Sequence, residues 1–139
     1  MYTIEIDGQT QFQCAAHDVL LRGGLRQGLG LPYECNAGGC GSCKIEVLSG
    51  EIENLWIDAP GLSDRDRRKG RLFACQCRPN LYCKLNVRLD QHYVPKTIPR
   101  QFSVTLKKVQ QITHDIIEIQ LQAAQPAVFI PGQYALLSV

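Results

Sequence analysis

The sequence lacks the features of a membrane protein or of a nucleic-acid-binding protein. No apolar run approaches the roughly 18 residues that a membrane helix requires. The formal net charge is only +2 over 139 residues, so we expect neither nucleic acid nor an anionic membrane as a partner. The N-terminus lacks a basic region followed by an apolar core, which predicts no signal peptide and a cytoplasmic location.

Other absences narrow the class of function. There is no G-x-S-x-G elbow and no evident pair of catalytic carboxylates, so hydrolysis has no support. Repeats and low-complexity tracts are missing too, while 45% of the residues are hydrophobic and 20% are charged, which is a globular composition. The length suits one small domain followed by part of another.

Cysteine, by contrast, is abundant. The chain has seven cysteines, which is many for a compartment where thiols stay reduced. Clustered cysteines in such a compartment serve more often as metal ligands or catalytic groups than as disulfides. The odd number weakens a disulfide framework further.

Residues 1–92 predict a small α+β domain. Apolar residues alternate over residues 2–6, and Asp7-Gly8 suits the hairpin turn to a second strand. A third strand is expected around Ile45. A fourth is indicated by five residues that form one half-buried face: Leu81, Cys83, Leu85, Val87 and Leu89.

Two helices are expected in this domain. The first has Asp18 as its N-cap and ends before Gly28, and its buried side carries Leu20, Leu21 and Leu25. The second begins at an acidic capping box from Ser63 to Asp66 and ends at Gly70. This stretch also carries a basic run: Arg65, Arg67, Arg68, Lys69 and Arg71. The run is either a solvated surface that complements the helix dipole or a docking patch for an acidic redox partner.

Residues 93–100 hold two prolines and little to pack, which predicts a linker. Residues 101–139 return to strand alternation, in two sets: Phe102, Val104 and Leu106, then Ile117, Ile119 and Leu121. Pro131-Gly132 suits the centre of a type II turn, and a third strand is expected over residues 134–139. Three strands cannot close a barrel, so this segment predicts the first part of a second domain.

The cysteine spacing carries the strongest chemical signal. Cys35, Cys40 and Cys43 give C-x4-C-x2-C, and with Cys75 far downstream this is the pattern of plant-type 2Fe–2S clusters. Three thiolates from one loop must wrap a compact inorganic core, and the glycines of the loop tolerate the tight curl. Six residues of the loop have N–H groups that can point at the sulfurs and offset cluster charge: Asn36, Ala37, Gly38, Gly39, Gly41 and Ser42.

Other metal sites fit this spacing less well. Structural zinc sites usually use two C-x2-C pairs, a 4Fe–4S ferredoxin would show C-x2-C-x2-C, and a Rieske centre needs two histidine ligands. The three histidines, His17, His92 and His114, are scattered outside the cysteine loop. We expect them to be surface or turn residues.

Three cysteines remain outside the proposed ligand set. Cys14 and Cys83 lie on apolar strand faces and are expected to be small buried hydrophobes. Cys77 is different, because spacing alone does not separate it from Cys75 as the fourth ligand.

Several stretches resemble the reductase components of bacterial aromatic-ring oxygenases, in particular those of toluene monooxygenase and carbazole dioxygenase systems. They are residues 32–44, Trp56 with residues 58–63, and residues 73–77. The resemblance implies Cys75 as the fourth ligand, within a Leu-Ala-Cys-Gln context whose leucine is phenylalanine here. It also implies a β-grasp fold, a small mixed sheet over a helix, with the cluster near the surface.

The resemblance continues past the linker. Residues 128–134, Val-Phe-Ile-Pro-Gly-Gln-Tyr, resemble the strand and turn that open the flavin domain of the ferredoxin-reductase family, an antiparallel barrel that binds FAD. Gln133 and Tyr134 would then lie near the flavin. The family's next flavin contact, Arg-x-Tyr-Ser, and its nucleotide-binding domain are not in the sequence. An incomplete barrel is therefore implied.

The function implied by the resemblance is stepwise electron transfer. NAD(P)H delivers a hydride, FAD in the flavin domain accepts both electrons, and the 2Fe–2S cluster passes them on singly. The acceptor would be an oxygenase component or an intermediate ferredoxin. Two hypotheses stay open: a part of such a reductase, which is an enzyme, and a free-standing 2Fe–2S electron carrier with a C-terminal tail. The strands beyond the linker favour the first.

Overall fold

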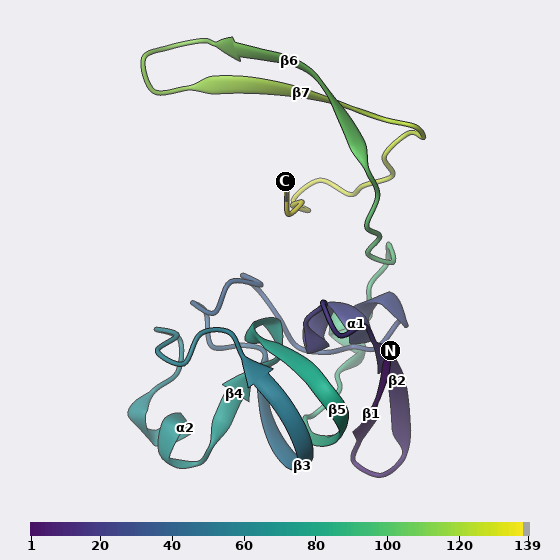
Figure 1. Cartoon of the computed structure of the whole chain (residues 1–139), viewed down its shortest axis with the longest axis vertical. Helices are drawn as coiled ribbons and strands as arrows, with labels where there is room; N and C mark the ends of the chain where they lie inside the picture. The colour runs from purple at the N-terminus through teal and green to yellow at the C-terminus, as the bar shows by residue number, and fades with distance from the viewer. Residues whose placement is uncertain (138–139) are drawn as a thin grey trace. The chain divides into compact units, whose positions relative to one another are not determined.

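The computed structural model describes residues 1–137. It divides into two compact units, Met1–Pro99 and Arg100–Val139, which are drawn in Figure 1. The boundary falls inside the predicted linker of residues 93–100. The division of the chain into domains of 1–92 and 101–139 stays a prediction. No helix of the described residues is long and apolar enough to cross a membrane.

The first unit is a five-stranded mixed sheet in the order β2-β1-β5-β3-β4, with the helix α1 packed against it (Figure 1). β1 and β5 are parallel, and the other pairs are antiparallel. The strands are β1 (Tyr2–Ile6), β2 (Thr10–Cys14), β3 (Lys44–Asn54), β4 (Arg71–Phe73) and β5 (Cys77–Asn86). The helices are α1 (Leu20–Arg26), α2 (Asp64–Arg68) and two 3-10 turns, η1 (Ala74–Gln76) and η2 (Gln91–Tyr93). This arrangement confirms the predicted α+β class and the β-grasp.

The core lies between the sheet and α1. Ile4 and Ile6 of β1 pack with Phe12 of β2 and with the leucines of α1, all of them almost fully buried. The predicted alternation in residues 2–6 is therefore confirmed. Asp7 and Gly8 have φ angles of 51° and 72°, as a hairpin turn of type I′ requires.

The start of α1 differs from the prediction. Val19, not Asp18, is the N-cap residue, and it makes no side-chain capping bond. Asp18 accepts a hydrogen bond from the Val19 N–H at 2.9 Å and pairs with Arg22 and Arg26 of the helix. The predicted N-cap is wrong by one residue, because ion pairs with the helix, rather than its free N–H groups, hold this carboxylate.

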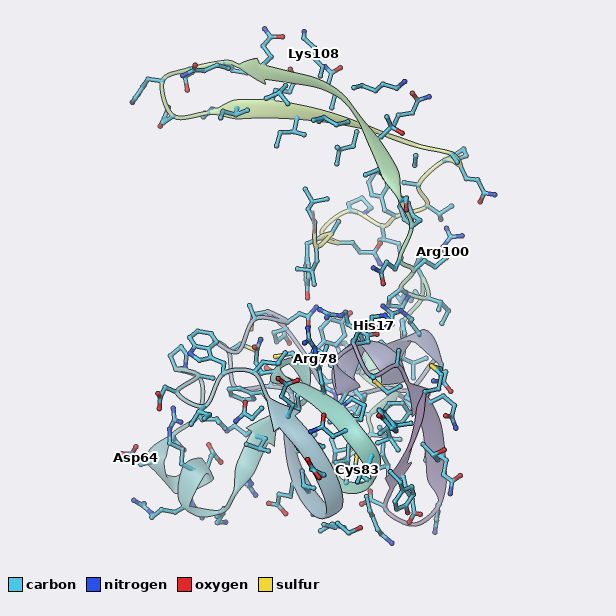
Figure 2. All side chains as sticks on the ribbon, viewed as in Figure 1. His17, Asp64, Arg78, Cys83, Arg100 and Lys108 are labelled. Carbon is cyan, nitrogen blue, oxygen red and sulfur yellow. The ribbon has the colours of Figure 1, made fainter. Side chains whose placement is uncertain are left out.

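A bulge corrects the prediction for β5. Cys83 (labelled in Figure 2) and Leu85 are buried, but Leu81 is 55% exposed. Gly50 pairs with Cys83 and Ile52 with Pro79. Between these two pairs β5 therefore has more residues than β3, which is a β-bulge. The extra residues turn Leu81 out of the alternating face, which sequence alternation alone does not reveal.

The second predicted helix forms with its expected cap. Ser63 accepts a hydrogen bond from the Asp66 N–H at 3.2 Å and donates its hydroxyl to the Asp66 carboxylate at 2.7 Å. That buried carboxylate also pairs with Lys44 and Arg71. The hydrogen bond from Ser63 and the two cations lower the pKa of Asp66, so α2 is fixed to the start of β3 and to β4 by a charged group.

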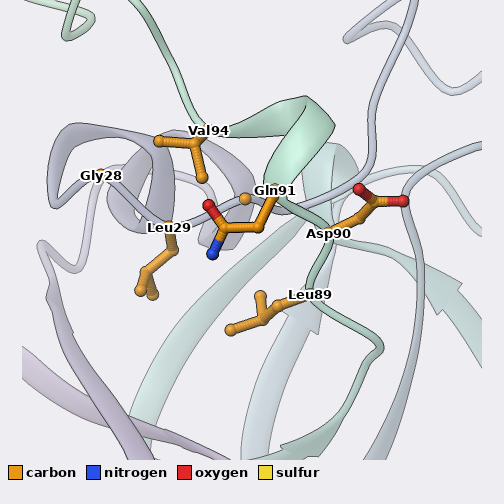
Figure 3. A pocket seen from close by; sticks show the side chains of 7 residues that line it. Gly28, Leu29, Leu89, Asp90, Gln91 and Val94 are labelled. Carbon is orange, nitrogen blue, oxygen red and sulfur yellow. The ribbon is translucent and has the colours of Figure 1, made fainter.

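A shallow hollow marks where the chain leaves this sheet (Figure 3). Residues 28–30, before the cysteine loop, form one wall, and residues 89–94 form the other. The Asp90 N–H donates to the Gly30 carbonyl at 2.9 Å. The hollow is lined mainly by glycine and aliphatic residues, and it lies where the end of the first unit meets the segment that leads to Cys35.

The second unit is a two-stranded antiparallel sheet of β6 (Val104–Gln111) and β7 (Ile117–Ala123). Gly132 has a φ of 92° and the Gln133 N–H donates to the Ile130 carbonyl at 3.1 Å, which confirms the turn. The prediction of a third strand is wrong for residues 134–137, because β6 and β7 are the only paired strands in the described part of this unit. Residues 138 and 139 lie outside the described residues.

We predict that Gly50→Ala destabilises the first unit. Gly50 has a φ of 96°, and an added Cβ would lie 2.2 Å from the Tyr82 carbonyl oxygen. Strain and overpacking together should lower the free energy of unfolding by about 3 kcal/mol, measured by anaerobic urea unfolding. Gly28→Ala is the control, because its φ is 77° but no atom lies within 4 Å; it should lose about 1 kcal/mol. Equal losses would contradict a role for the close approach of β5.

Candidate metal centre

The cysteine loop joins α1 to β3 without regular structure. It turns through three residues with positive φ: Asn36 at 51°, Gly38 at 75° and Gly41 at 83°. Asparagine and glycine reach this region at low energy. The turns curl the backbone so that Ala37 N–H points at Cys35 Sγ at 3.3 Å and Ser42 N–H at Cys40 Sγ at 3.5 Å.

The fourth thiol is brought to the loop by the edge of the sheet. β4 pairs with the start of β3, and the Ala74 N–H donates to the Cys43 carbonyl at 2.9 Å. Cys75 follows on η1, so its sulfur lies 3.3 Å from that of Cys43. The Gly38 N–H and the Gln76 side chain also donate to Cys75. Two residues distant in sequence thus form one thiol pair.

Hydrogen bonds favour the thiolate form of Cys40 and Cys75 and the neutral thiol of Cys43. The pKa of Cys75 is lowered to about 6 by the bond from Cys43, helped by Gly38 and Gln76, while burial opposes the shift. Burial would also raise the pKa of Cys40, but bonds from Ser42 and Cys35 lower it to about 7. Cys43 donates to Cys75 and is buried, and both effects raise its pKa. Thiolates are the form that binds metal.

The thiols fit a binuclear centre better than a single ion. They form two pairs: Cys43 donates a hydrogen bond to Cys75 at 3.3 Å, and Cys35 lies close enough to Cys40 to lower the pKa of the Cys40 thiol. A 2Fe–2S cluster takes four cysteines over two irons, hence two for each iron. Structural zinc needs four donors around one point, whereas these four thiols lie as two pairs. The donor set therefore fits the predicted cluster.

A neighbouring segment packs directly on the loop. We call residues 55–62 the cover segment. The Gly61 N–H donates to the Gly38 carbonyl at 3.1 Å, and a Cβ on Gly61 would lie 2.8 Å from that oxygen and 2.9 Å from the Gly39 carbonyl. Arg67 of α2 holds the segment, since its guanidinium donates to the carbonyls of Ile57 and Ala59 at 2.6 and 2.8 Å.

The structure separates Cys75 from the other cysteines. Cys14, Cys77 and Cys83 are fully buried in the core, and burial raises the pKa of their thiols to about 11, 12 and 11. Among the described cysteines, it is Cys75 and not Cys77 whose sulfur lies within hydrogen-bonding distance of Cys43. Cys14, Cys77 and Cys83 therefore behave as small apolar residues.

The remaining predicted residues lie apart from the loop. Gln133 accepts a hydrogen bond from the Ile130 N–H at 2.9 Å and so braces its turn, and Tyr134 is exposed. Their place near a flavin stays a prediction. The histidines His17, His92 and His114 are exposed, as expected.

Sequence reasoning missed two residues that support the loop. Gly61 was only part of a run that resembles the reductases, and Arg67 was only part of a basic run. No short-range pattern marks either, because both act through contacts with distant backbone.

We predict that Cys75→Ser removes or strongly distorts the visible absorption of the cluster, because it takes one thiolate from a pair. Cys77→Ser and Cys83→Ser are the controls and should keep the spectrum, since both thiols are buried in the core. Absorption and iron content of anaerobically purified variants would measure this. Loss of the spectrum in Cys77→Ser with retention in Cys75→Ser would reverse the ligand assignment.

We also predict that Gly61→Ala shortens the lifetime of the bound cluster about tenfold or more, because its Cβ would overlap the Gly38 and Gly39 backbone and push the loop away. Gly70→Ala is the control, since Gly70 lies outside the cysteine loop and no atom lies within 4 Å of its Cβ position. Bleaching of the visible absorption in the presence of an iron chelator gives the lifetime. An unchanged cluster lifetime in Gly61→Ala would contradict the claim that the cover segment stabilises the cysteine loop.

The chain is similar to the ferredoxin–NAD(P)(+) reductase CarAd of Metapseudomonas resinovorans, with 43% identity over 139 residues. It is 35% identical over 134 residues to the ferredoxin–NAD(+) reductase component of an alkene monooxygenase system from Xanthobacter autotrophicus. The match covers 99% and 96% of this chain, but 42% and 40% of those proteins.

A solved structure described as the ferredoxin reductase in carbazole 1,9a-dioxygenase matches with a TM-score of 0.90 and 41% identity, over 95% of this chain and 41% of that one. Residues 4–80, more than half of the chain, match the family model for the 2Fe-2S iron-sulfur cluster binding domain. Those residues include the loop, η1 and the cover segment. The chain belongs to the family of 2Fe-2S iron-sulfur cluster binding domains.

Proposed function

We propose that the first unit transfers single electrons through a 2Fe–2S cluster held by Cys35, Cys40, Cys43 and Cys75, as the ferredoxin part of an NAD(P)H-dependent reductase. The observation that carries the proposal is the arrangement of four thiols as two pairs. The cluster, when bound, accepts and donates one electron at a time.

The chain's own residues serve this function by holding the thiolates and balancing their charge. The N–H groups of Ala37, Gly38 and Ser42 donate to three of the sulfurs. Such bonds stabilise the added negative charge of the reduced cluster and so raise its reduction potential. Cys40 is exposed while Cys43 and Cys75 are buried, which leaves one edge of the site open to a redox partner.

The function of the longer protein is inferred from the similar proteins. Two are named as ferredoxin reductases, one of them of an alkene monooxygenase system, and a third is the electron transfer component of a xylene/toluene monooxygenase. One similar structure is described as the FAD apo form of the ferredoxin reductase in carbazole 1,9a-dioxygenase. We infer that FAD and NAD(P)H act in the longer protein, that a flavin domain reduces the cluster, and that an oxygenase component or an intermediate ferredoxin accepts its electrons. The free thiols support a reducing compartment, the cytoplasm.

The second unit supports the reductase over a free electron carrier. β6 and β7 expose apolar side chains on an isolated hairpin, including Leu106, Val109, Ile117 and Ile119. A two-stranded sheet is marginal by itself, so these side chains suit a barrel built from further strands. A carrier with a tail would not need them. All the proposed ligands nevertheless lie in the first unit, so that unit can act as a carrier on its own.

We predict that residues 1–139 bind the cluster but do not oxidise NADH with an artificial acceptor, because residues 1–137, which the structure describes, offer no nicotinamide pocket. Residues 1–99 should hold the same two irons and two sulfides per chain. Extension by the natural downstream sequence should enable turnover. Tight FAD binding and NADH oxidation by residues 1–139 alone would contradict the proposed division of labour. A downstream sequence without flavin or nucleotide sites would favour the free carrier.

A further inference from the structure

We propose that the exposed apolar residues Leu55, Trp56 and Ile57, at the edge of the cysteine loop, form the surface on which an acidic protein electron acceptor docks. The inference rests on the proposed function and specifies the partner's contact surface. It draws on four observations: exposure, rigidity, closeness to the loop and charge.

Three consecutive apolar residues of the first unit are exposed here. Leu55, Trp56 and Ile57 are 39%, 43% and 71% exposed. Contiguous exposed apolar side chains often mark interaction sites, and tryptophan is among the residues that most often dominate a protein interface.

These residues are held rigidly. The Leu55 N–H donates to the Gln76 carbonyl at 2.8 Å and the Trp56 N–H to Asn54 Oδ1 at 3.1 Å. Arg67 binds the Ile57 carbonyl at 2.6 Å. A surface fixed in advance loses less conformational freedom on binding. The backbone bonds therefore prepare the segment for contact with a partner.

The segment also lies at the redox centre. The indole ring of Trp56 packs against Gly38: its Cε3 and Cζ3 atoms lie 3.1 and 3.3 Å from the point that a Cβ atom on Gly38 would occupy. Gly38 is the residue whose N–H donates to Cys75. Gly39 and Cys40 are exposed beside it. Electron transfer slows steeply with distance, so an acceptor seated on Trp56 would lie at the favourable edge of the cluster.

Charge selects an acidic partner. Residues 64–71, which follow the cover segment, hold five arginines and lysines but two aspartates. Asp66 is buried and paired with Lys44 and Arg71, so Asp58 and Asp64 are the exposed carboxylates within residues 55–71. Arg65 and Arg68 are exposed and form no ion pair with a described residue. The excess positive charge would steer a negatively charged surface toward the site.

The acceptor suits this surface better than the flavin domain of the same polypeptide. A tethered domain meets the cluster at high effective concentration and needs little affinity. An untethered acceptor has to be captured from solution, which an apolar anchor and a cationic rim would achieve.

The test is the rate of electron transfer from reduced residues 1–139 to the acidic haem domain of cytochrome b5, followed by stopped flow. The cluster loses one electron and the ferric haem gains it. Ile57→Asp and Arg65→Glu/Arg68→Glu should each lower the second-order rate constant about tenfold at low ionic strength. High salt should reduce the difference in rate between the wild type and Arg65→Glu/Arg68→Glu, because salt screens the charges.

Two control variants match these changes elsewhere. Leu81→Asp alters an equally apolar side chain, 55% exposed at the β5 bulge. Arg88→Glu/Lys96→Glu makes the same change in net charge at two exposed residues of the first unit, outside residues 55–71. Both should stay within about twofold of the wild type, because steering depends on where the charge lies. Losses as large in the controls, or unchanged rates in the first two variants, would overturn the docking surface.

Three further measurements separate the alternatives. Absorption and reduction potential test the proposed function itself, since a wild-type chain without a reducible cluster refutes that function whatever the docking kinetics. A wild-type dimer that Ile57→Asp converts to a monomer would assign the surface to a second copy and overturn the proposal. In the longer protein, slower NADH-driven cluster reduction with unchanged cytochrome kinetics would assign it to the flavin domain, also against the proposal.

Discussion

Holding four thiolates within reach of one another is the constraint on which the rest of the first unit depends. Like charges repel most strongly where water is excluded. The sulfurs of Cys43 and Cys75 lie 3.3 Å apart because Cys43 donates its proton to Cys75 in a hydrogen bond, and both must be thiolates to bind metal. The loop answers with backbone N–H groups aimed at the sulfurs, which requires positive φ at Asn36, Gly38 and Gly41. The sheet supplies the fourth thiol by pairing β4 with β3.

The same constraint explains why distant segments converge on the loop. A backbone bent so that its N–H groups face inward turns carbonyls outward, and these need donors of their own. Gly61 donates to one of them from the cover segment, which Arg67 in turn holds by its carbonyls. α2 is fixed through Asp66 to Lys44 and Arg71. The helix, the cover segment and the loop thus act as connected parts of one site.

Local chemistry made much of this predictable. The Asp7-Gly8 turn, the Ser63 cap and the cysteine spacing each depend on a few adjacent residues, and a sequence displays these directly. The N-cap at Val19 and the outward Leu81 depend instead on ion pairs and on a bulge set by a partner strand. Gly61 and Arg67 act through non-local backbone contacts, so no pattern announced them. The strand expected at residues 134–137 needs a partner strand that the described residues do not provide.

The central claim is that these four thiols hold a binuclear cluster that accepts one electron. Mössbauer spectroscopy of the anaerobically purified, iron-57-enriched chain tests it most directly. The account predicts one coupled pair of ferric ions in the oxidised chain, and one ferric with one ferrous ion after reduction by a single electron. A single mononuclear iron species, or a pair that accepts no electron, would contradict it.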